Sequence, residues 1–397
     1  MRVVVIGSGF GGLAAAIRLQ QQGHDVTILE KRDKPGGRAY VYEQDGFTFD
    51  GGPTIITAPW LIHELFERSG RRTRDYVDLV PIDPFYNIRF EDGSVFRYTG
   101  DRAQVIEQIR RIAPEDVGGY ERFAAATERI FESGMALIDT PFDRLTDMLR
   151  VVPDLVRLFE ELGGTLWFDS EVGEIAIDPR TRRATGVRLA EGDVVPADAV
   201  VSNGDVATTY MTLVPSAYRR RNTDRRFRRM RYSMSLFVMY FGTDRRYDDV
   251  AHHEILMGPR YRGLLDDIFT RKSLADDFSL YLHRPTATDP SLAPPGCDSW
   301  YVLSPVPNLG GSTDWRTAAR PYRDRIVEYL ERRYLPNLSR HIVTERTIDP
   351  LHFRDTLNSH LGSAFSVEPI LPQSAWFRPH KGFLRRSAPP REMPLLF

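Results

Sequence analysis

The first forty residues alternate between short apolar runs and glycine-rich breaks. Residues 3–6 form a continuous β-branched run, which is typical of a strand covered on both faces of a sheet. An alanine-rich stretch at 12–23 follows and has the pattern of a helix that ends at Gly23. Residues 25–30 form a second apolar strand pattern. The order strand, helix, strand predicts a parallel α/β unit.

The pattern changes after about residue 60. Residues 85–100 alternate apolar and polar positions around Asp92-Gly93 and predict a hairpin. A late amphipathic helix is predicted at 321–336, with Ile326, Tyr329 and Leu330 on one face. Between these two elements the patterns predict helices at 100–116, 119–134 and 143–158, the last broken near Pro153, then strands within 164–205 and the strands of a second, mixed sheet at 233–242 and 298–307.

The first break holds Gly7, Gly9 and Gly12 at the spacing G-x-G-x-x-G. The first glycine permits a tight turn, the second lets the backbone approach a pyrophosphate, and the third lets the helix pack closely on the strand. Glu30 ends the second strand, where an acidic side chain binds ribose hydroxyls and repels a 2′-phosphate. Together these features predict a Rossmann-type dinucleotide site.

Two further glycine pairs indicate which dinucleotide is bound. Residues 36–37 precede Arg38, and residues 51–52 stand between Asp50 and Thr54. Taken alone, each pair is explained as a surface turn. In series with the first motif, further close backbone approaches and a guanidinium suit a longer ligand whose flavin end must also be held. We therefore expect FAD.

Longer strings resemble one family. These strings are EKRDKPGGRAY, FTFDGGPT, SLFVMYFG, AHHEILMGPRYRGLLDDIF, DFSLYLHRPTATDPSLAPPGC and GSAFSVEPILPQSAWFRPH. They closely resemble the bacterial and fungal phytoene desaturases, which are FAD-dependent carotenoid desaturases among the amine-oxidase-like flavoproteins. The resemblance runs to about His380. It implies an α/β fold, with a Rossmann-like FAD-binding domain and an interleaved α+β substrate domain. It also implies desaturation of the lipophilic polyene phytoene toward lycopene or neurosporene, by hydride transfer to FAD.

The same resemblance implies the domain division and the site residues. The FAD-binding domain is expected at 1–75 and 159–208, the substrate domain at 76–158 and 209–379, and an atypical tail at 380–397. Asp147 and Arg150 match polar positions of a family helix near the substrate, although their (i, i+3) spacing equally suits an ion pair on a helix surface. The implied FAD contacts are Gly7, Gly9, Phe10, Gly11, Gly12, Glu30, Lys31, Gly36, Gly37, Arg38, Gly52, Pro53, Thr54 and Val172.

The chain departs from this family in two places. The family continues after the position of Leu158 with a long helical segment, whereas here Phe159 follows directly, within a helical stripe that Gly163 caps. At the other departure, the family's last strand and glycine-rich turn give way to a proline-containing tail after His380. The tail keeps an alternative open, that the chain is an inactive, truncated dinucleotide-binding remnant of such an enzyme.

The composition of the chain excludes further classes of binding partner and of metal site. A formal net charge of −1 argues against a nucleic-acid partner, and Cys297, the single cysteine, excludes internal disulfides and cysteine-based metal sites. Neither a signal peptide nor a membrane-spanning run is expected, so the predicted location is cytoplasmic. Eight arginines within 219–231 suit either a solvated helix face or a peripheral contact with anionic lipid headgroups.

Motifs for other chemistries are missing from the sequence. It contains neither H-E-x-x-H nor G-x-S-x-G. The pair His252-His253 lies in a strand-like stretch, where neighbouring side chains point to opposite faces, so we expect packing or surface positions and no metal site. Such a lack of protein catalytic groups suits a flavoenzyme, because a flavin itself accepts hydride.

Overall fold

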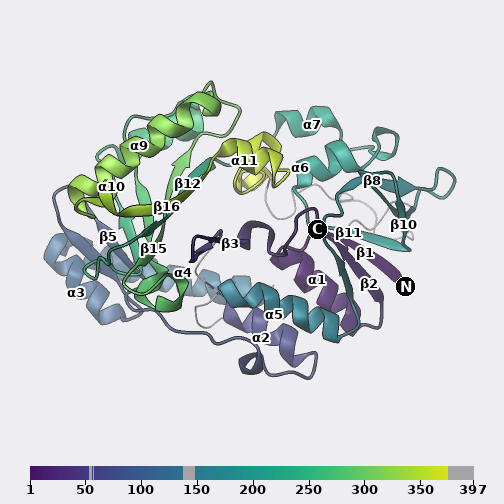
Figure 1. Ribbon diagram of the computed structural model, residues 1–397, viewed down its shortest axis with the longest axis horizontal. Helices are drawn as coiled ribbons and strands as arrows, with labels where there is room; N and C mark the ends of the chain where they lie inside the picture. Colours follow the sequence, from purple (N-terminus) through teal and green to yellow (C-terminus); the bar gives the residue numbers. More distant parts are fainter. Residues whose placement is uncertain (53–55, 57, 137–147, 374–397) are drawn as a thin grey trace.

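The computed structural model describes residues 1–52, 56, 58–136 and 148–373 and has its two largest sheets at opposite ends of the molecule (Figure 1). At the end with the N-terminus, a parallel sheet has the order β11-β1-β2-β7. The strands are β1 (Arg2–Ile6), β2 (Asp25–Leu29), β7 (Thr165–Trp167) and β11 (Ala199–Ser202). Helix α1 (Phe10–Gln21) connects β1 to β2, which confirms the predicted strand–helix–strand unit.

A smaller antiparallel sheet packs beside the parallel one. Its order is β10-β9-β8, with β8 at Val172–Ile177, β9 at Ala184–Leu189 and β10 at Val194–Pro196. Ile175 and Val187 are fully buried in the same core as Val4 and Leu29. Two short helices, α6 (Val206–Thr208) and α7 (Asp224–Arg229), add Ala207 and Phe227 to this core. The strands predicted within 164–205 are therefore confirmed.

The other end of the molecule is built on a mixed sheet with the order β16-β12-β15-β14-β13-β5-β6. Only the pair β13–β5 within this sheet is parallel. Hairpin β5–β6 contains Gly93 at a φ of +87°, as the Asp92-Gly93 signal predicts. The strands are β5 (Tyr86–Arg89), β6 (Val95–Tyr98), β12 (Ser235–Thr243), β13 (His253–Leu256), β14 (Leu280–His283), β15 (Asp298–Val306) and β16 (Ile342–Ile348).

Both faces of the mixed sheet are covered, which explains why β12 is buried along its whole length. Helix α9 (Trp315–Arg333) lies over one face and packs Tyr322 and Ile326 against Phe237. The hairpin of β3 (Val41–Gln44) and β4 (Phe47–Asp50) packs on the other face, where Tyr42 meets Tyr240. The two predicted apolar strands thus form the centre of this domain.

Helix α9 begins earlier than the sequence pattern indicates. The expected start at 321 is wrong, because the side chain of Asp314 accepts the backbone N–H of Arg316 and starts the helix at Trp315. Pro321 therefore lies inside the helix. The buried face of Ile326, Tyr329 and Leu330 is confirmed. The other helices are α2 (Pro59–Glu67), α3 (Arg102–Ile112), α4 (Val117–Ala136), α5 (Met148–Glu161), α8 (Tyr261–Asp266), α10 (Leu338–His341) and α11 (Pro350–Asp355).

Helix α5 contains the point where Leu158 meets Phe159. The expected break near Pro153 is wrong, since the helix runs through this residue to Glu161. Proline removes one N–H bond from the helix, and the burial of Val152 and Leu155 in a core shared with α1 compensates for that loss. Leu158 and Phe159 are fully buried in the same core. The helix is therefore continuous and packed at the point where the family resemblance predicts an omitted segment.

No helix within the described ranges is long and apolar enough to cross a membrane.

Replacing Leu158 by alanine tests the packing of α5 on α1. We expect a loss of about 2–5 kcal/mol in the free energy of unfolding, because the side chain is fully buried and leaves a cavity. Urea denaturation followed by circular dichroism measures this loss. Glu160→Ala, on the exposed face of the same helix, should change stability by less than about 0.5 kcal/mol. Equal effects of the two substitutions would contradict the packing.

Candidate cofactor-binding site

The turn between β1 and α1 is shaped by glycines. Gly7 has a φ of +91°, which disfavours any residue with a side chain. A Cβ at Gly12 would lie 2.0 Å from the carbonyl oxygen of Gly7, so only glycine lets α1 pack this closely. The N–H groups of the first turn of α1 have no partners within the helix. They are directed toward the edge where the parallel strands end and suit an anionic group such as a pyrophosphate.

The two further glycine pairs converge on this turn. Gly36 forms a bridge with Gly9, and its N–H donates to the carbonyl oxygen of Ser8 at 3.1 Å. A Cβ at Gly37 would lie 3.2 Å from the Cα of Gly9. The third pair joins through Gly52, where a Cβ would lie 2.1 Å from the carbonyl oxygen of Arg38. Segments that are far apart in sequence therefore form one backbone surface with little side-chain cover.

Glu30 lies at the edge of this surface. Its buried carboxylate accepts the N–H of Ser8 at 2.8 Å, the hydroxyl of Ser8 at 2.6 Å and the N–H of Arg32 at 3.0 Å. A carboxylate has about four lone-pair sites, so it retains capacity for a ribose hydroxyl. The N–H of Ser170 donates to the carbonyl oxygen of Glu30 at 2.8 Å, and Val172 begins β8 two residues later. Val172 thus lies close to the same edge.

Arg38 supplies positive charge beside the glycine pairs. Its Nη2 donates to the hydroxyl of Ser359 at 2.8 Å and to the carbonyl oxygen of Ser363 at 3.5 Å. Burial lowers the pKa of Arg38 below its usual value, and the charge of Asp205 partly opposes this shift. Among the described residues, no carboxylate forms an ion pair with Arg38. A half-buried guanidinium without an ion pair suits an anionic ligand.

The remaining residues predicted to contact FAD or substrate lie in several parts of the chain, and some of them lie outside the described residues. Phe10 is the half-buried first residue of α1 and packs into the core of that helix. The ammonium of Lys31 contacts the carboxylate of Glu171 at 3.1 Å and the side-chain oxygen of Asn358 at 3.0 Å. Pro53, Thr54, Asp147 and the tail at 380–397 lie outside the described residues. For Arg150, only its place in α5 is described.

Asn203 is a neighbour of the glycine turn that the sequence analysis did not select. It follows β11, and its Nδ2 and Oδ1 lie 3.1 Å and 2.5 Å from where a Cβ would stand at Gly9 and Gly11. Its amide N–H₂ can donate to a phosphate at the turn. The available signal was positional: parallel strands end at the same edge of a sheet, so a polar residue directly after such a strand lies near the motif.

The expectation that the side chains of the adjacent histidines point to opposite faces is wrong, whereas the expected packing position is confirmed for His253, which is 1% exposed. The rings of His252 and His253 do not diverge, because their centroids lie 4.3 Å apart. Strand β13 begins only at His253, and His252 precedes it in a bend, where the alternation of strand side chains does not apply. Together with His283 they form a cluster whose ring nitrogens lie within 4.8 Å of one another.

Comparison with known proteins agrees with this geometry. Residues 5–68 match the NAD(P)-binding Rossmann-like domain, and residues 129–381 match the flavin-containing amine oxidoreductases. The lycopene-forming phytoene desaturase of Pseudescherichia vulneris is 43% identical over 96% of this chain and 91% of its own length. The neurosporene-forming phytoene desaturase of Rhodobacter capsulatus is 37% identical over 96% of this chain and 87% of its own.

Two further findings concern chain length and fold. The alignment with the Pseudescherichia vulneris protein extends over 451 positions against 397 residues here, so that protein carries at least 54 residues that this chain lacks. This difference agrees with the expected internal loss. An oxidoreductase of known structure from Methanosarcina mazei has the same fold, with a TM-score of 0.58, 16% identity and 87% of each chain covered.

Arg38→Gln tests the predicted cofactor contact. We expect FAD to bind at least about tenfold more weakly, because a charge-assisted hydrogen bond to the ligand is lost while the fold keeps a polar side chain. Titration of the apoprotein with FAD, followed by quenching of flavin fluorescence, measures the affinity. Arg68→Gln, on the exposed surface of the chain after α2, is the matched control. Equal affinities of the two variants would remove Arg38 from the site.

Proposed function

The chain belongs to the phytoene desaturase family of flavin-containing amine oxidoreductases, and from this premise we propose that it desaturates phytoene toward lycopene or neurosporene with FAD as its cofactor. The observation that carries the proposal is the extent of the similarity, which is 43% identity over 96% of this chain and 91% of a phytoene desaturase. Similarity confined to the dinucleotide motif would support only a cofactor, whereas this similarity also spans the mixed sheet.

The alternative of an inactive remnant is not favoured. In a remnant that had lost its cofactor site, we would expect the glycine segments to be separated. Here they are held together by the bridge of Gly9 to Gly36 and the close approach of Gly52 to Arg38. The shortened substrate region also ends in a packed helix, with Leu158 and Phe159 buried. Both features support a chain that retains a working cofactor site.

We assign the residues that hold FAD from this geometry. The N–H groups at the start of α1 and the glycines of the three segments hold the pyrophosphate, with Asn203 as an added donor. Glu30 holds the ribose hydroxyls, and Val172 lies on the adenine side. Arg38 balances negative charge. When bound, FAD supplies the acceptor for the hydride that leaves a C–H bond of the polyene.

Each new double bond also requires that a proton leave the neighbouring carbon, and Asp147 is our candidate to accept it. Arg150, three residues further along the chain, would orient this carboxylate. The competing hypothesis is that the two residues form an ion pair on the helix surface. In both cases the protein's main contribution is to align an apolar substrate, because the hydride acceptor is the cofactor.

We further propose the interleaved domain division 1–75 and 159–208 for the cofactor, and 76–158 and 209–379 for the substrate. The position of β5–β6 in the mixed sheet supports a substrate role for residues after 76. Helix α5 is shared, since its buried face packs on α1.

A peripheral membrane contact would give this enzyme access to a water-insoluble substrate. Within 219–231, Arg219 is bound to Asp224, and Arg231 pairs with Glu368 at 2.7 Å. The side chain of Phe227 anchors α7 in the core, whereas Arg225, Arg228 and Arg229 are exposed. We propose that Arg225, Arg228 and Arg229 contact anionic lipid headgroups.

Asp147→Asn distinguishes the two roles of that residue. If Asp147 accepts the proton, kcat for phytoene desaturation on liposomes should fall by about 100-fold or more, with FAD affinity unchanged. The control is Glu160→Gln on the exposed face of α5. Unchanged turnover in the Asp147 variant would support the ion pair and end the catalytic hypothesis.

The triple variant Arg225→Gln, Arg228→Gln, Arg229→Gln tests the membrane contact. At about 1 kcal/mol per arginine, binding to phosphatidylglycerol vesicles should weaken by roughly 100-fold in a cosedimentation assay. Arg316→Gln, Arg320→Gln, Arg332→Gln on α9 removes the same charge elsewhere and should leave binding unchanged. If both triple variants lose the same affinity, the contact depends on total charge rather than on α7.

A further inference from the structure

A cluster of histidines lies at one end of the strand pair β13–β14. His253 and His283 face each other across the antiparallel pair, and His252 bends toward them from the preceding residue. The ring centroid of His283 lies 4.8 Å from that of His252 and 5.0 Å from that of His253. One nitrogen from each ring can be chosen so that all lie within 4.8 Å of one another.

Several of these ring nitrogens are buried without a partner. Nε2 of His253 and both ring nitrogens of His283 have no hydrogen-bond partner among the described residues, although these side chains are only 1% and 2% exposed. A neutral imidazole carries one donor and one acceptor, and buried polar atoms of native proteins are nearly always paired. These nitrogens therefore point to a ligand.

Neighbouring side chains hold the rings in orientations that suit such a ligand. Nδ1 of His252 lies 2.5 Å from the hydroxyl of Thr288, and Nδ1 of His253 lies 2.6 Å from the hydroxyl of Tyr281. The ring of His283 stacks on Tyr301, with centroids 4.7 Å apart. Histidines that bind metals commonly donate one N–H to such an outer partner, which leaves the other nitrogen for the ion.

Burial lowers the pKa of His252 to about 4 and that of His253 to about 3, and it also holds the pKa of His283 well below its usual value. Arg284, next in the chain, adds a positive charge that also lowers the pKa of His252.

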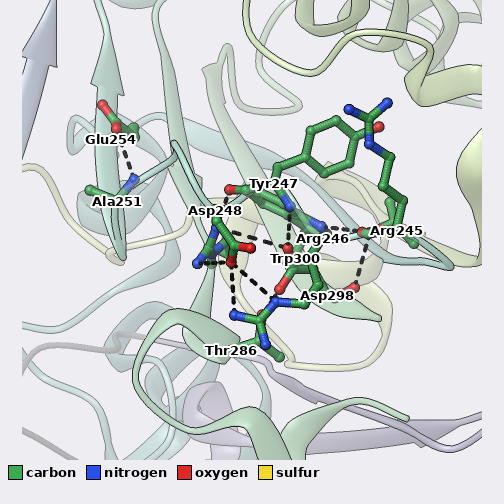
Figure 2. Close-up of polar contacts among 11 residues, drawn as sticks. Arg245, Arg246, Tyr247, Asp248, Ala251, Glu254, Thr286, Asp298 and Trp300 are labelled. Carbon is green, nitrogen blue, oxygen red and sulfur yellow. Dashed lines mark hydrogen bonds and ion pairs between the residues drawn. The ribbon is translucent and has the colours of Figure 1, made fainter. Parts of the chain in front are cut away.

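That positive charge is balanced by an adjacent polar network. Arg284 lies 3.5 Å from Asp248 and 3.9 Å from the fully buried Asp298, and it donates to the carbonyl oxygen of Tyr247. Figure 2 shows Asp298 accepting hydrogen bonds from the backbone of Tyr247 at 2.8 Å and from Thr286 at 2.7 Å. The network uses its own carboxylates internally and leaves Nε2 of His253 and both ring nitrogens of His283 without a partner among the described residues.

We propose that His252, His253 and His283 bind one divalent transition-metal ion of the zinc or cobalt type. Imidazole donors favour this class, whereas magnesium and calcium prefer oxygen ligands. In a tetrahedral site with Zn–N distances of about 2.0–2.1 Å, the nitrogens lie about 3.4 Å apart. The present spacing of up to 4.8 Å is wider, so binding of the ion would require the rings to move closer together. The ion would tie β13 to β14, and a solvent ligand would complete its coordination.

The test uses tag-free, chelator-treated full-length protein titrated with Co²⁺. We expect one ion per chain, the intense visible absorption of a tetrahedral site, and displacement of Co²⁺ by Zn²⁺. His252→Gln and His283→Gln should each weaken binding by more than about tenfold. Zn²⁺ should raise the melting temperature of the wild type and leave that of both variants unchanged. These readouts do not depend on FAD or phytoene, so they are separate from the proposed function.

Control variants distinguish binding of the ion at this cluster from nonspecific binding elsewhere on the protein. His24→Gln, far from the cluster in the chain, should bind as the wild type does, and Tyr281→Phe should weaken binding about tenfold as a loss of positioning. His252 is the least buried of the three, so its variant keeps the test valid if His283→Gln does not fold. Absence of Co²⁺ binding, or equal affinity in His252→Gln and the wild type, would overturn the proposal. Ordered water alone on these nitrogens in a crystal grown with Zn²⁺ would also overturn it.

Discussion

The close packing of α1 on the end of β1 is the contact on which the cofactor site depends. It requires that residue 12 have no side chain, since a Cβ there would lie 2.0 Å from the carbonyl oxygen of Gly7. This approach sets where the helix begins and directs its free N–H groups to the carboxyl ends of the parallel strands. Glu30 follows β2 and Asn203 follows β11, and both strands run parallel to β1 on either side of it, so the two residues lie at the same edge. The steric condition at Gly12 and the parallel pairing of these strands thus bring together groups from three parts of the chain.

A second constraint joins this site to the mixed sheet. The hairpin β3–β4 follows directly from the second glycine pair and leads into the third, yet its side chains pack on β12. Tyr42 contacts Tyr240 with ring centroids 5.4 Å apart, and the hydroxyl of Tyr240 donates to the carbonyl oxygen of Gly51 at 3.1 Å. The backbone expected to touch the cofactor is therefore fixed against the sheet expected to bind the substrate. The relative position of the glycine segments and the mixed sheet is therefore set by packing rather than by a flexible linker.

The interior of the shortened region is completed by α5. Its buried residues Val152, Leu155 and Leu158 share a core with Leu13 and Ile17 of α1. The core is therefore buried at Leu158 and Phe159, where the family resemblance predicts an omitted segment. Proline at 153 is tolerated because one missing backbone hydrogen bond costs less than the burial of the apolar face gains. Local sequence rules gave too much weight to the proline because they do not include tertiary burial.

The amino-acid sequence by itself determined the elements whose signals are local. The glycine spacing at residues 7–12, the terminal Glu30, the apolar runs that became β1, β12 and β15, and the Asp92-Gly93 turn all depend on nearest neighbours along the chain. Tertiary structure decided what depends on distant partners. It placed Asn203 beside the glycine turn because β11 pairs with β1, and it continued α5 and α9 through their prolines because their faces are buried. It also brought His252 and His253 together with His283, through a bend before β13 and the register of β13 with β14. Neither of these can be predicted from two adjacent histidines in the sequence.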